Sequence, residues 1–539
     1  MKSIITKDFG ITNAENFESM VSLPLSRVYV MVGRTTPWAN TSNPTTLDDI
    51  TVQTPYDTTS YKNQIFNDAE LIKRVTSSDI QPVIPRVDWA NNEVYVAYDQ
   101  TANLFTKVLD TAYTSGSVNV GSGLLNTINA NGINFTTVTP SISIGSIIKI
   151  GDERKEVVSF NSTALVVNTS FASAYSSANL FKTTVTTTQY ANKFYVRNTK
   201  DQVFKCLFNN GGIVSNTMPQ ISIGGELPEN PYVETADGYK WKFMYTIPTG
   251  LKNKFFTDKY MPVLRDTIVF DNAKDGRIDI VKIIDGGSGY YGGTTVSNYA
   301  IVDVDGDGTL ADITVDVVDG VITDINIVNG GNNYTRATIT LDDPIKQLIG
   351  NTANLQAIIS PQYGHGSDAA RELGASSLMI SVDFSSDVDG NLPTQSNGKD
   401  TIRQFSLVRD IKLKTGSLAT GSVYPMYTKV FTSNPPVDFD NNAEIYVGSS
   451  YETAVFKARV VHFDSASNVL YLNNLVGDLT AVENEAVRQK DAPSSFAKAF
   501  NVVSPDINIF SGEILYVENR DKITRNLSQT ETLKLVVEF

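Results

Sequence analysis

The sequence predicts a mainly β, multidomain protein with an antiparallel β-sandwich architecture, a few short helices and inserted β modules. Long stretches are dominated by Thr, Ser, Asn, Val, Ile, Tyr and Phe. Gly, Pro, Asn-Gly or Asp-Gly interrupts these stretches about every 8 to 12 residues, which is typical of short antiparallel strands. The 539 residues, 41% of them hydrophobic, can bury more than one core, so we expect roughly three or four domains.

Alternating apolar and polar residues mark the expected strands. The clearest lie at residues 26–32, 94–98, 146–150, 194–196, 239–245, 402–408 and 533–539. The last of these patterns continues to the final residue, which differs from the polar tail of many domains. We therefore expect the C-terminus to be held in a sheet.

Three segments have the apolar spacing of helices. They are a segment that Asn13 would cap and that reaches Val21, a segment over 60–75, and a short one over 367–373 that Gly374 would end. The rest of the chain is predicted to be β structure.

Residues 275–290 and 319–334 form an internal repeat with a constant offset of 44 residues and no gap. Each copy has alternating apolar residues, then a Gly-Gly pair, then a tyrosine. The alternation predicts a half-buried strand, and the glycines permit a tight turn that returns the chain. Two copies are too few for a propeller or solenoid, so we expect paired hairpins in one small β module.

These patterns divide the chain into five expected regions. They are an N-terminal region with helices (1–100), an inserted β module rich in Ser, Thr, Asn and Gly (101–190), a β region (191–270), an inserted β module with the tandem repeat (271–360), and a C-terminal β domain that packs with the N-terminal region (361–539).

Composition excludes several classes of function. The 44 basic and 58 acidic residues give a net charge of −14, and the basic residues are not clustered as a nucleic-acid surface requires. A single cysteine, Cys206, excludes an intramolecular disulfide and a multi-thiolate zinc site. There is neither a signal-peptide pattern nor an apolar stretch of about 18 residues, so we expect no membrane partner.

One segment resembles the start of a calcium loop. Asp303, Asp305 and Asp307 alternate before a glycine, as carboxylates do around this cation. The twelfth position is Thr314, which cannot supply the bidentate carboxylate of that loop. The alternative is a solvated turn between two strands, and we expect no cofactor.

Other groups have the chemistry of active sites but simpler explanations. His365 lies between glycines and suits a turn or an interface, while His462 lies in an expected strand. Acidic pairs that a glycosidase could use are Glu234 with Asp237 and Asp387 with Asp389. Both contain Asp-Gly turn signals, and we expect no catalytic site.

Six large residues are the candidate anchors of a core or an interface. Aromatic rings held by turns make such anchors, and guanidinium groups hold carboxylates and carbonyl oxygens in fixed geometry. The candidates are Arg34, Trp38, Arg86, Trp89, Trp241 and Arg520, with Glu518 as one partner for Arg520. A solvated surface position is the alternative for each arginine.

Four motifs carry a resemblance to a known family. They are Val-Gly-Arg-Thr-Thr-Pro-Trp at 32–38, Val-Ile-Pro-Arg-Val-Asp-Trp at 83–89, Asp-Gly-Tyr-Lys-Trp at 237–241, and Gly-Glu-Ile-Leu-Tyr-Val-Glu-Asn-Arg at 512–520. In order and context they resemble the gene 8 baseplate wedge proteins of T4-like phages. The resemblance covers roughly 1–100, 191–265 and 400–539, and it gives 101–190 and 271–360 no counterpart.

The resemblance implies a structural protein and not an enzyme. It implies a homodimer that joins other wedge subunits, the products of genes 6, 7 and 10, in the tail baseplate of a virion, after synthesis in the host cytoplasm. Such subunits transmit baseplate rearrangement to sheath contraction. The alternatives are a tail protein that binds host-surface carbohydrate and a polysaccharide depolymerase.

Overall fold

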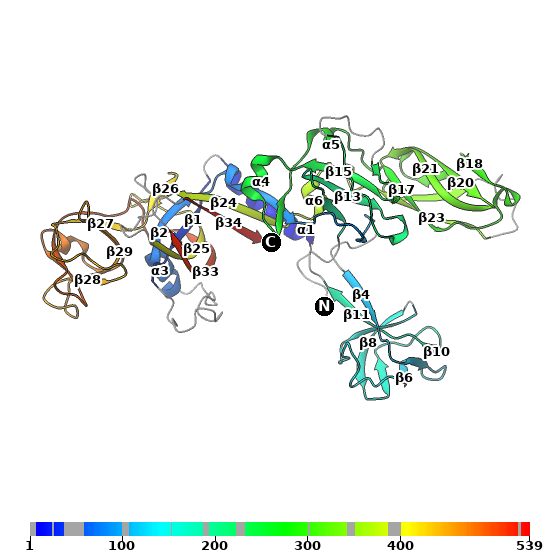
Figure 1. Ribbon diagram of the computed structural model, residues 1–539, viewed down its shortest axis with the longest axis horizontal. Coiled ribbons are helices and arrows are strands. Elements are labelled where there is room, and N and C mark those ends of the chain that lie inside the picture. Colours follow the sequence, from blue (N-terminus) through cyan, green and yellow to red (C-terminus); the bar gives the residue numbers. More distant parts are fainter. Residues whose placement is uncertain are drawn as a thin grey trace. The chain divides into compact units, whose positions relative to one another are not determined.

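The computed structural model describes residues 7–23, 26–36, 59–99, 107–151, 153–186, 193–222, 232–299, 302–341, 351–385, 400–525 and 530–539. The chain forms two compact units. Unit 1 contains Met1–Val83, Asn253–Phe256 and Ala375–Phe539, and unit 2 contains Ile84–Lys252 and Thr257–Gly374. Strands predominate in both, which confirms the expected mainly β, multidomain fold (Figure 1).

Unit 1 has two open antiparallel sheets. In spatial order, the first consists of β26 (Val423–Pro425), β2 (Ala69–Arg74), β1 (Val28–Gly33), β25 (Asp400–Arg409) and β33 (Glu513–Arg525). The second contains β3 (Ile80–Pro85), β24 (Ser377–Ser385) and β34 (Thr530–Glu538). β24 pairs with β34 along its whole length, so the last strand is held in a sheet as expected.

A closed six-stranded barrel completes unit 1 (orange in Figure 1). Its strands, in order around the barrel, are β27 (Thr428–Thr432), β30 (Val469–Gly477), β29 (Phe456–Asp464), β28 (Glu444–Val447), β31 (Ala486–Gln489) and β32 (Phe496–Val503). Apolar side chains such as Val430, Val460 and Leu472 fill its interior. Closure pairs every strand edge, which makes the barrel a rigid body.

Two helices in the described part of unit 1, α1 and α3, differ from the predicted ones. α1 (Lys7–Ser22) begins six residues before Asn13, so Asn13 is an interior residue and not the cap. α3 (Thr59–Asp68) ends halfway through the helix predicted over 60–75, and the second half is the strand β2. β2 pairs with β1 on one side and β26 on the other. Its apolar residues are buried by these neighbours, and tertiary pairing overrides the helical spacing.

Unit 2 contains an eight-stranded antiparallel sheet between residues 107 and 186. Its spatial order is β10 (Tyr175–Ala178), β5 (Ser117–Val120), β6 (Thr127–Asn131), β9 (Ala164–Val167), β8 (Glu153–Phe160), β7 (Ile147–Ile150), β11 (Phe181–Thr186) and β4 (Lys107–Ala112). One core forms from its alternate residues, including Val118, Ile128 and Ile148.

A four-stranded sheet forms the centre of unit 2. It consists of β12 (Tyr195–Arg197), β13 (Gln202–Phe208), β15 (Lys240–Thr246) and β14 (Val233–Glu234). Other elements of this part of the chain are α4 (Thr249–Phe255), β16 (Tyr260–Pro262), α5 (Thr267–Asp271) and α6 (Ala369–Leu373). The predicted short helix is confirmed as α6, which Asp368 caps and Gly374 ends at φ 77°.

The prediction of a strand over residues 94–98 is wrong. This segment is extended, but it does not belong to a sheet. Two of its amides donate to separate places, Val96 to the carbonyl of Lys193 and Tyr98 to that of Cys206. The apolar alternation is still used, because Tyr95 and Ala97 are buried in the core of the four-stranded sheet.

The tandem repeat folds into one β module with exchanged strands. Its strands are β17 (Ile278–Asp285), β18 (Val296–Tyr299), β19 (Val302–Gly306), β20 (Thr309–Val318), β21 (Val321–Asn332), β22 (Ala337–Leu341) and β23 (Asn354–Ile359). β17, which leads the first copy, pairs with β23, which follows the second copy. β21, which leads the second copy, pairs with β20, which follows the first. The expected pair of hairpins is therefore wrong for the first copy.

Candidate functional site

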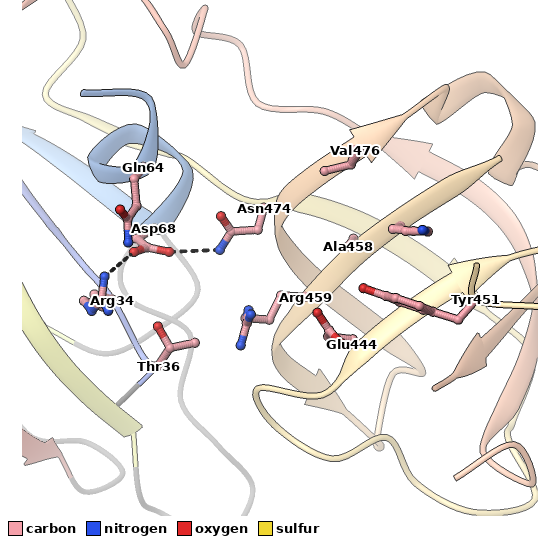
Figure 2. Close-up of a pocket in the computed structure, with 11 residues that line it drawn as sticks. Arg34, Thr36, Gln64, Asp68, Glu444, Tyr451, Ala458, Arg459, Asn474 and Val476 are labelled. Carbon is pink, nitrogen blue, oxygen red and sulfur yellow. Dashed lines mark hydrogen bonds and ion pairs between the residues drawn. The ribbon is translucent and has the colours of Figure 1, made fainter. Parts of the chain in front are cut away.

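A solvent-open crevice of about 500 Å³ lies in unit 1, between the barrel and a wall formed by α3 and the loop after β1. Figure 2 shows Arg34, Thr36, Gln64 and Asp68 on one wall, and residues of β28, β29 and β30 on the other. Most of the lining side chains are polar or charged. This crevice combines a predicted anchor, Arg34, with charged groups that are far apart in the sequence.

Arg34 has a constrained backbone. It follows β1 directly and has a φ of 64°, which is uncommon for a residue with a side chain. Its amide donates to the carbonyl oxygen of Asp68 at 2.8 Å, and its Nη1 donates to the Asp68 carboxylate at 2.9 Å. Both side chains are largely buried, at 11% and 7% exposure. Strained residues of this kind are found often at functional positions.

Asp68 connects the two walls of the crevice. Its second carboxylate oxygen accepts a hydrogen bond from the side-chain amide of Asn474 in β30, at 2.9 Å (Figure 2). Beside it, the hydroxyl of Thr35 donates to the side-chain oxygen of Asn442 at 2.5 Å. These contacts fix the loop after β1 against the barrel.

The barrel wall carries its own ion pair. Lys490 donates to the Glu444 carboxylate at 2.5 Å, and this bond holds the pKa of that carboxyl below its usual range. The ammonium groups of Lys490 and Lys457 lie 4.2 and 4.5 Å from the centroid of the Tyr451 ring. Such cation–π contacts fix both lysines beside the crevice.

Arg459 occupies the centre of the barrel wall. It is on β29, directly opposite Glu444 of β28. Its Nε is buried, and within the described part of the chain it has no hydrogen-bond partner. A buried donor without a partner is costly, so this atom is notable.

Two of the predicted tryptophan anchors have different environments. Trp241 is fully buried in unit 2, stacked on Tyr239 with ring centroids 5.5 Å apart and edge-on to Tyr95. Trp89 is only partly buried, and its indole N–H donates to the hydroxyl of Ser215 at 3.1 Å. Trp38 lies outside the described residues.

The other predicted arginines make local ion pairs. Arg86 pairs with Asp88 at 2.5 Å, and its amide donates to the carbonyl of Lys259. Arg520 is half exposed and pairs with Glu518 at 2.5 Å, the partner that the sequence suggests. Neither arginine contributes to the crevice, so the structure does not bring the predicted anchors together.

One carboxylate of the calcium candidate, that of Asp307, accepts hydrogen bonds within the fold. Asp307 accepts hydrogen bonds from the amides of Thr335 and Arg336 at 2.9 and 3.1 Å, and from the Thr335 hydroxyl. These bonds lower the pKa of Asp307. The side chain of Asp303 lies outside the described residues. No group of three His, Cys, Asp or Glu among the described residues could hold a metal.

His365 belongs to a buried charged cluster in unit 2. The Lys205 ammonium lies 2.9 Å from the Glu372 carboxylate, and His365 Nδ1 lies 3.2 Å from both groups. Tyr98 covers the lysine, with its ring centroid 4.0 Å from Nζ. Burial alone would raise the pKa of Glu372, but the adjacent Lys205 and His365 lower it to about 2. This histidine lies in a turn, as the sequence suggests, but it is a buried packing residue and is not exposed.

The remaining candidates for chemistry are held by packing and hydrogen bonds. Asp237 accepts from the hydroxyl of Ser215 and from the amides of Asn216 and Thr217, and these bonds organise a loop. Burial raises the pKa of the Cys206 thiol, which makes it unreactive. His462 is buried in β29, as the sequence suggests. Asp387 and Asp389 lie outside the described residues.

A comparison with protein families tests the resemblance that the four sequence motifs carry. Residues 3–156 match the family model of bacteriophage T4 Gp8. The resemblance to the gene 8 baseplate wedge proteins is thereby confirmed, and it supports a structural role in a phage baseplate. Two motifs, at 32–38 and 83–89, lie inside the Gp8 match. The match extends over residues 101–156, which lie outside the four motifs.

No curated protein matches the chain. Among the described residues, no helix is long and apolar enough to span a bilayer. The Gp8 family is a structural family and not an enzyme family, which agrees with the use of the buried charged groups for packing.

Sequence reasoning missed the partners in the crevice and in the buried cluster. The apolar spacing assigns Asp68 to a longer helix, and Arg459 resembles many other strand residues. Lys205 and Glu372 are 167 positions apart, so only the fold brings them together. A lysine within an apolar strand, Phe-Lys-Cys-Leu-Phe at 204–208, is the one available signal of a buried charge.

Proposed function

We propose that this chain is a structural wedge subunit in the baseplate of a contractile-tailed phage. The match of residues 3–156 to T4 Gp8 is the observation that supports the proposal. The motif Asp-Gly-Tyr-Lys-Trp at 237–241, outside the match, adds to it, because Trp241 and Tyr239 form the core of the central sheet of unit 2.

The geometry of the folded parts suits a mechanical role. The closed barrel has no free strand edge, and unit 2 contains a buried, paired lysine. Such elements resist deformation, because close-packed cores move as rigid units and do not deform continuously. The β domains can then act as rigid levers when the baseplate rearranges.

The proposal includes partners and location. The chain forms a homodimer and joins the counterparts of the products of genes 6, 7 and 10 in the virion tail baseplate, after synthesis in the host cytoplasm. Rearrangement of these subunits on host contact is transmitted to sheath contraction. Segments 101–190 and 271–360 are proposed as inserted modules on this framework.

Electron cryo-microscopy of intact virions tests this function. Density for the barrel and the central sheet of unit 2 should be present in the baseplate, in copies related by its rotational symmetry. Co-expression with the other wedge subunits should give a complex that survives size-exclusion chromatography. Absence of the chain from the baseplate, or its presence only in fibres, would refute the assignment.

A further inference from the structure

The crevice in unit 1 is positively charged although the whole protein is strongly acidic. Three basic side chains line the crevice, Arg34, Lys457 and Arg459, and Lys490 lies beside it. Two carboxylates line it among the described residues, those of Asp68 and Glu444. The crevice lining thus has an excess of one positive charge in a chain with a net charge of −14.

Both carboxylates are already committed to basic partners. Asp68 pairs with Arg34 at 2.9 Å, and Glu444 pairs with Lys490 at 2.5 Å. Within the described residues, Arg459 forms no ion pair. It lies opposite Glu444 and adds to the effect of Lys490 in lowering the pKa of that carboxyl. The excess positive charge is therefore on the barrel wall, at Arg459 and Lys457.

The position of Arg459 suits the capture of a planar anion. β29 lies between β28 and β30 in the closed barrel, so the backbone of Arg459 is fixed. Its guanidinium offers several N–H donors in one plane, and its buried Nε lacks a partner in the described chain. A carboxylate accepts two parallel hydrogen bonds from this group.

The crevice also has an apolar part. Val476 is 65% exposed, and the ring of Tyr451 lies nearby on the same wall. These surfaces suit the methylene groups of an acidic side chain better than a fully hydrated inorganic ion. The volume of about 500 Å³ is enough for more than one side chain.

We propose that this crevice receives an acidic segment of another polypeptide, with an Asp or Glu carboxylate bound to Arg459. This inference rests on the proposed function, since a wedge subunit must bind neighbouring proteins. The Arg34–Asp68 pair shapes the facing wall, and Lys457 adds long-range attraction. The partner is recognised by charge complementarity, which steers association and fixes register.

A synthetic peptide tests this inference on the full-length protein. Fluorescence-labelled hexaglutamate should bind, and raising the salt concentration should weaken binding. Arg459→Gln should reduce the affinity at least about tenfold, because it removes a charge-assisted pair. Arg459→Lys keeps the charge but loses the planar fork, so its affinity should be intermediate.

A matched control separates the site from general charge. Arg488→Gln removes the same charge from the same barrel, where Arg488 lies over the Phe496 ring and does not line the crevice. It should leave hexaglutamate affinity within about twofold of wild type. Equal losses in both variants would show non-specific attraction and overturn the inference.

Competition identifies the source of the anion. Inorganic phosphate at millimolar concentration should displace hexaglutamate poorly. Efficient displacement would show that the crevice binds a free oxyanion and not a protein segment, which would overturn the inference. A failure of hexaglutamate to bind, with normal assembly into baseplates, would overturn the crevice inference and leave the proposed function intact. Absence of the chain from baseplates would instead overturn the function, whatever the peptide does.

Discussion

Gly286 and Gly330 occupy equivalent, reciprocal positions in the tandem repeat. A Cβ atom on Gly286 would lie 2.4 Å from the carbonyl oxygen of Ile322 in the second copy. One on Gly330 would lie 2.4 Å from the carbonyl oxygen of Ile278 in the first copy. Ile278 and Ile322 are themselves matched by the repeat. Each copy thus presses a glycine against the leading strand of the other, and the module has approximate two-fold symmetry.

This contact makes both glycines sensitive to the smallest side chain. Gly330→Ala and Gly286→Ala should each destabilise the module by about 1–3 kcal/mol, because the added methyl group meets rigid backbone. Neither glycine has a positive φ, so the effect is steric alone. Hydrogen exchange over residues 275–334 reports on the module specifically, and thermal unfolding reports on the whole protein.

The same substitution at an open glycine serves as the control. A Cβ atom on Gly121 would meet no other described atom within 4 Å, and the φ of Gly121 is not positive. Gly121→Ala should change stability by less than about 0.5 kcal/mol. If Gly330→Ala exchanges hydrogen as slowly as wild type, the reciprocal contact is not required.

The buried Lys205–Glu372 pair gives the protein a defined sensitivity to acid. The pKa of Glu372 is lowered to about 2 in the folded chain, from an ordinary value of 4.5. The ionised carboxylate is therefore favoured by folding. Its contribution is complete above about pH 4.5 and is lost as the pH falls toward 2. At pH 7, Glu372→Gln should cost about 3–5 kcal/mol, because it leaves a buried lysine without its carboxylate.

Melting curves at a series of pH values check this assignment. The difference in Tm between wild type and Glu372→Gln should narrow from pH 5 to pH 2. Lys205→Met combined with Glu372→Leu should recover much of the stability, since it removes both charges. Glu513→Gln, which breaks an exposed pair with Arg409, should have an effect below about 1 kcal/mol. A constant difference across the pH range would contradict the lowered pKa.

The two described tryptophans should respond differently to truncation. Trp241→Ala removes a fully buried ring and should cost about 3–5 kcal/mol. Trp89→Ala should cost less, since that ring is only partly buried. Trp241→Phe should be the mildest change at position 241, because the indole N–H has no hydrogen-bond partner in the described residues. Denaturant unfolding of the three variants gives the order, and a larger loss for Trp89→Ala would reverse the assignment.

Removal of the final strand should expose an edge of β24. A chain truncated after Thr530 loses eight of the nine residue pairs between β24 and β34, and the contact between the rings of Phe17 and Phe539, 5.6 Å apart. Unpaired strand edges associate with other chains, so we expect aggregates in light scattering. Phe539→Ala, which removes only the ring contact, should remain soluble. A monodisperse truncated protein would show that β34 is dispensable.

Chelation should leave stability unchanged. The Asp307 carboxylate is already bonded to two amides and a hydroxyl, which reduces its capacity to bind a cation. EDTA should therefore not change Tm, and Asp307→Asn should still fold because its remaining side-chain oxygen accepts hydrogen bonds. A decrease in Tm that calcium alone restores would establish a metal site.

The sequence predicts an element well where its local pattern is enough to determine whether it forms a helix or a strand. The strands predicted over 239–245 and 402–408 correspond to β15 and β25, and α6 ends at Gly374 because only a residue that tolerates a left-handed backbone fits there. The helix expected over 60–75 shows the limit. Its apolar spacing suits a helix, but β1 and β26 bury residues 69–74 as a strand, and no local pattern reveals those neighbours.

The crevice is only partly predictable for the same reason. Arg34 is a candidate from its motif, but its partner Asp68 and the facing Arg459 lie 34 and 425 positions away. The repeat behaves differently. Its sequence identifies the equivalent glycines correctly, yet it suggests hairpins, because sequence similarity does not reveal that the copies exchange their partner strands.

The order of the chain in unit 1 has a consequence for synthesis. β1 pairs with β25, which follows it by more than 360 residues, and β24 pairs with β34, which is synthesised later. At about 5–20 residues per second, β1 remains without this neighbour for roughly 20 to 70 s on the ribosome. The strands of unit 2 emerge during this delay and all precede residue 375. Unit 2 can thus fold during translation, before β25 is available to complete the first sheet of unit 1, and chains that lack the barrel cannot carry a finished crevice into assembly.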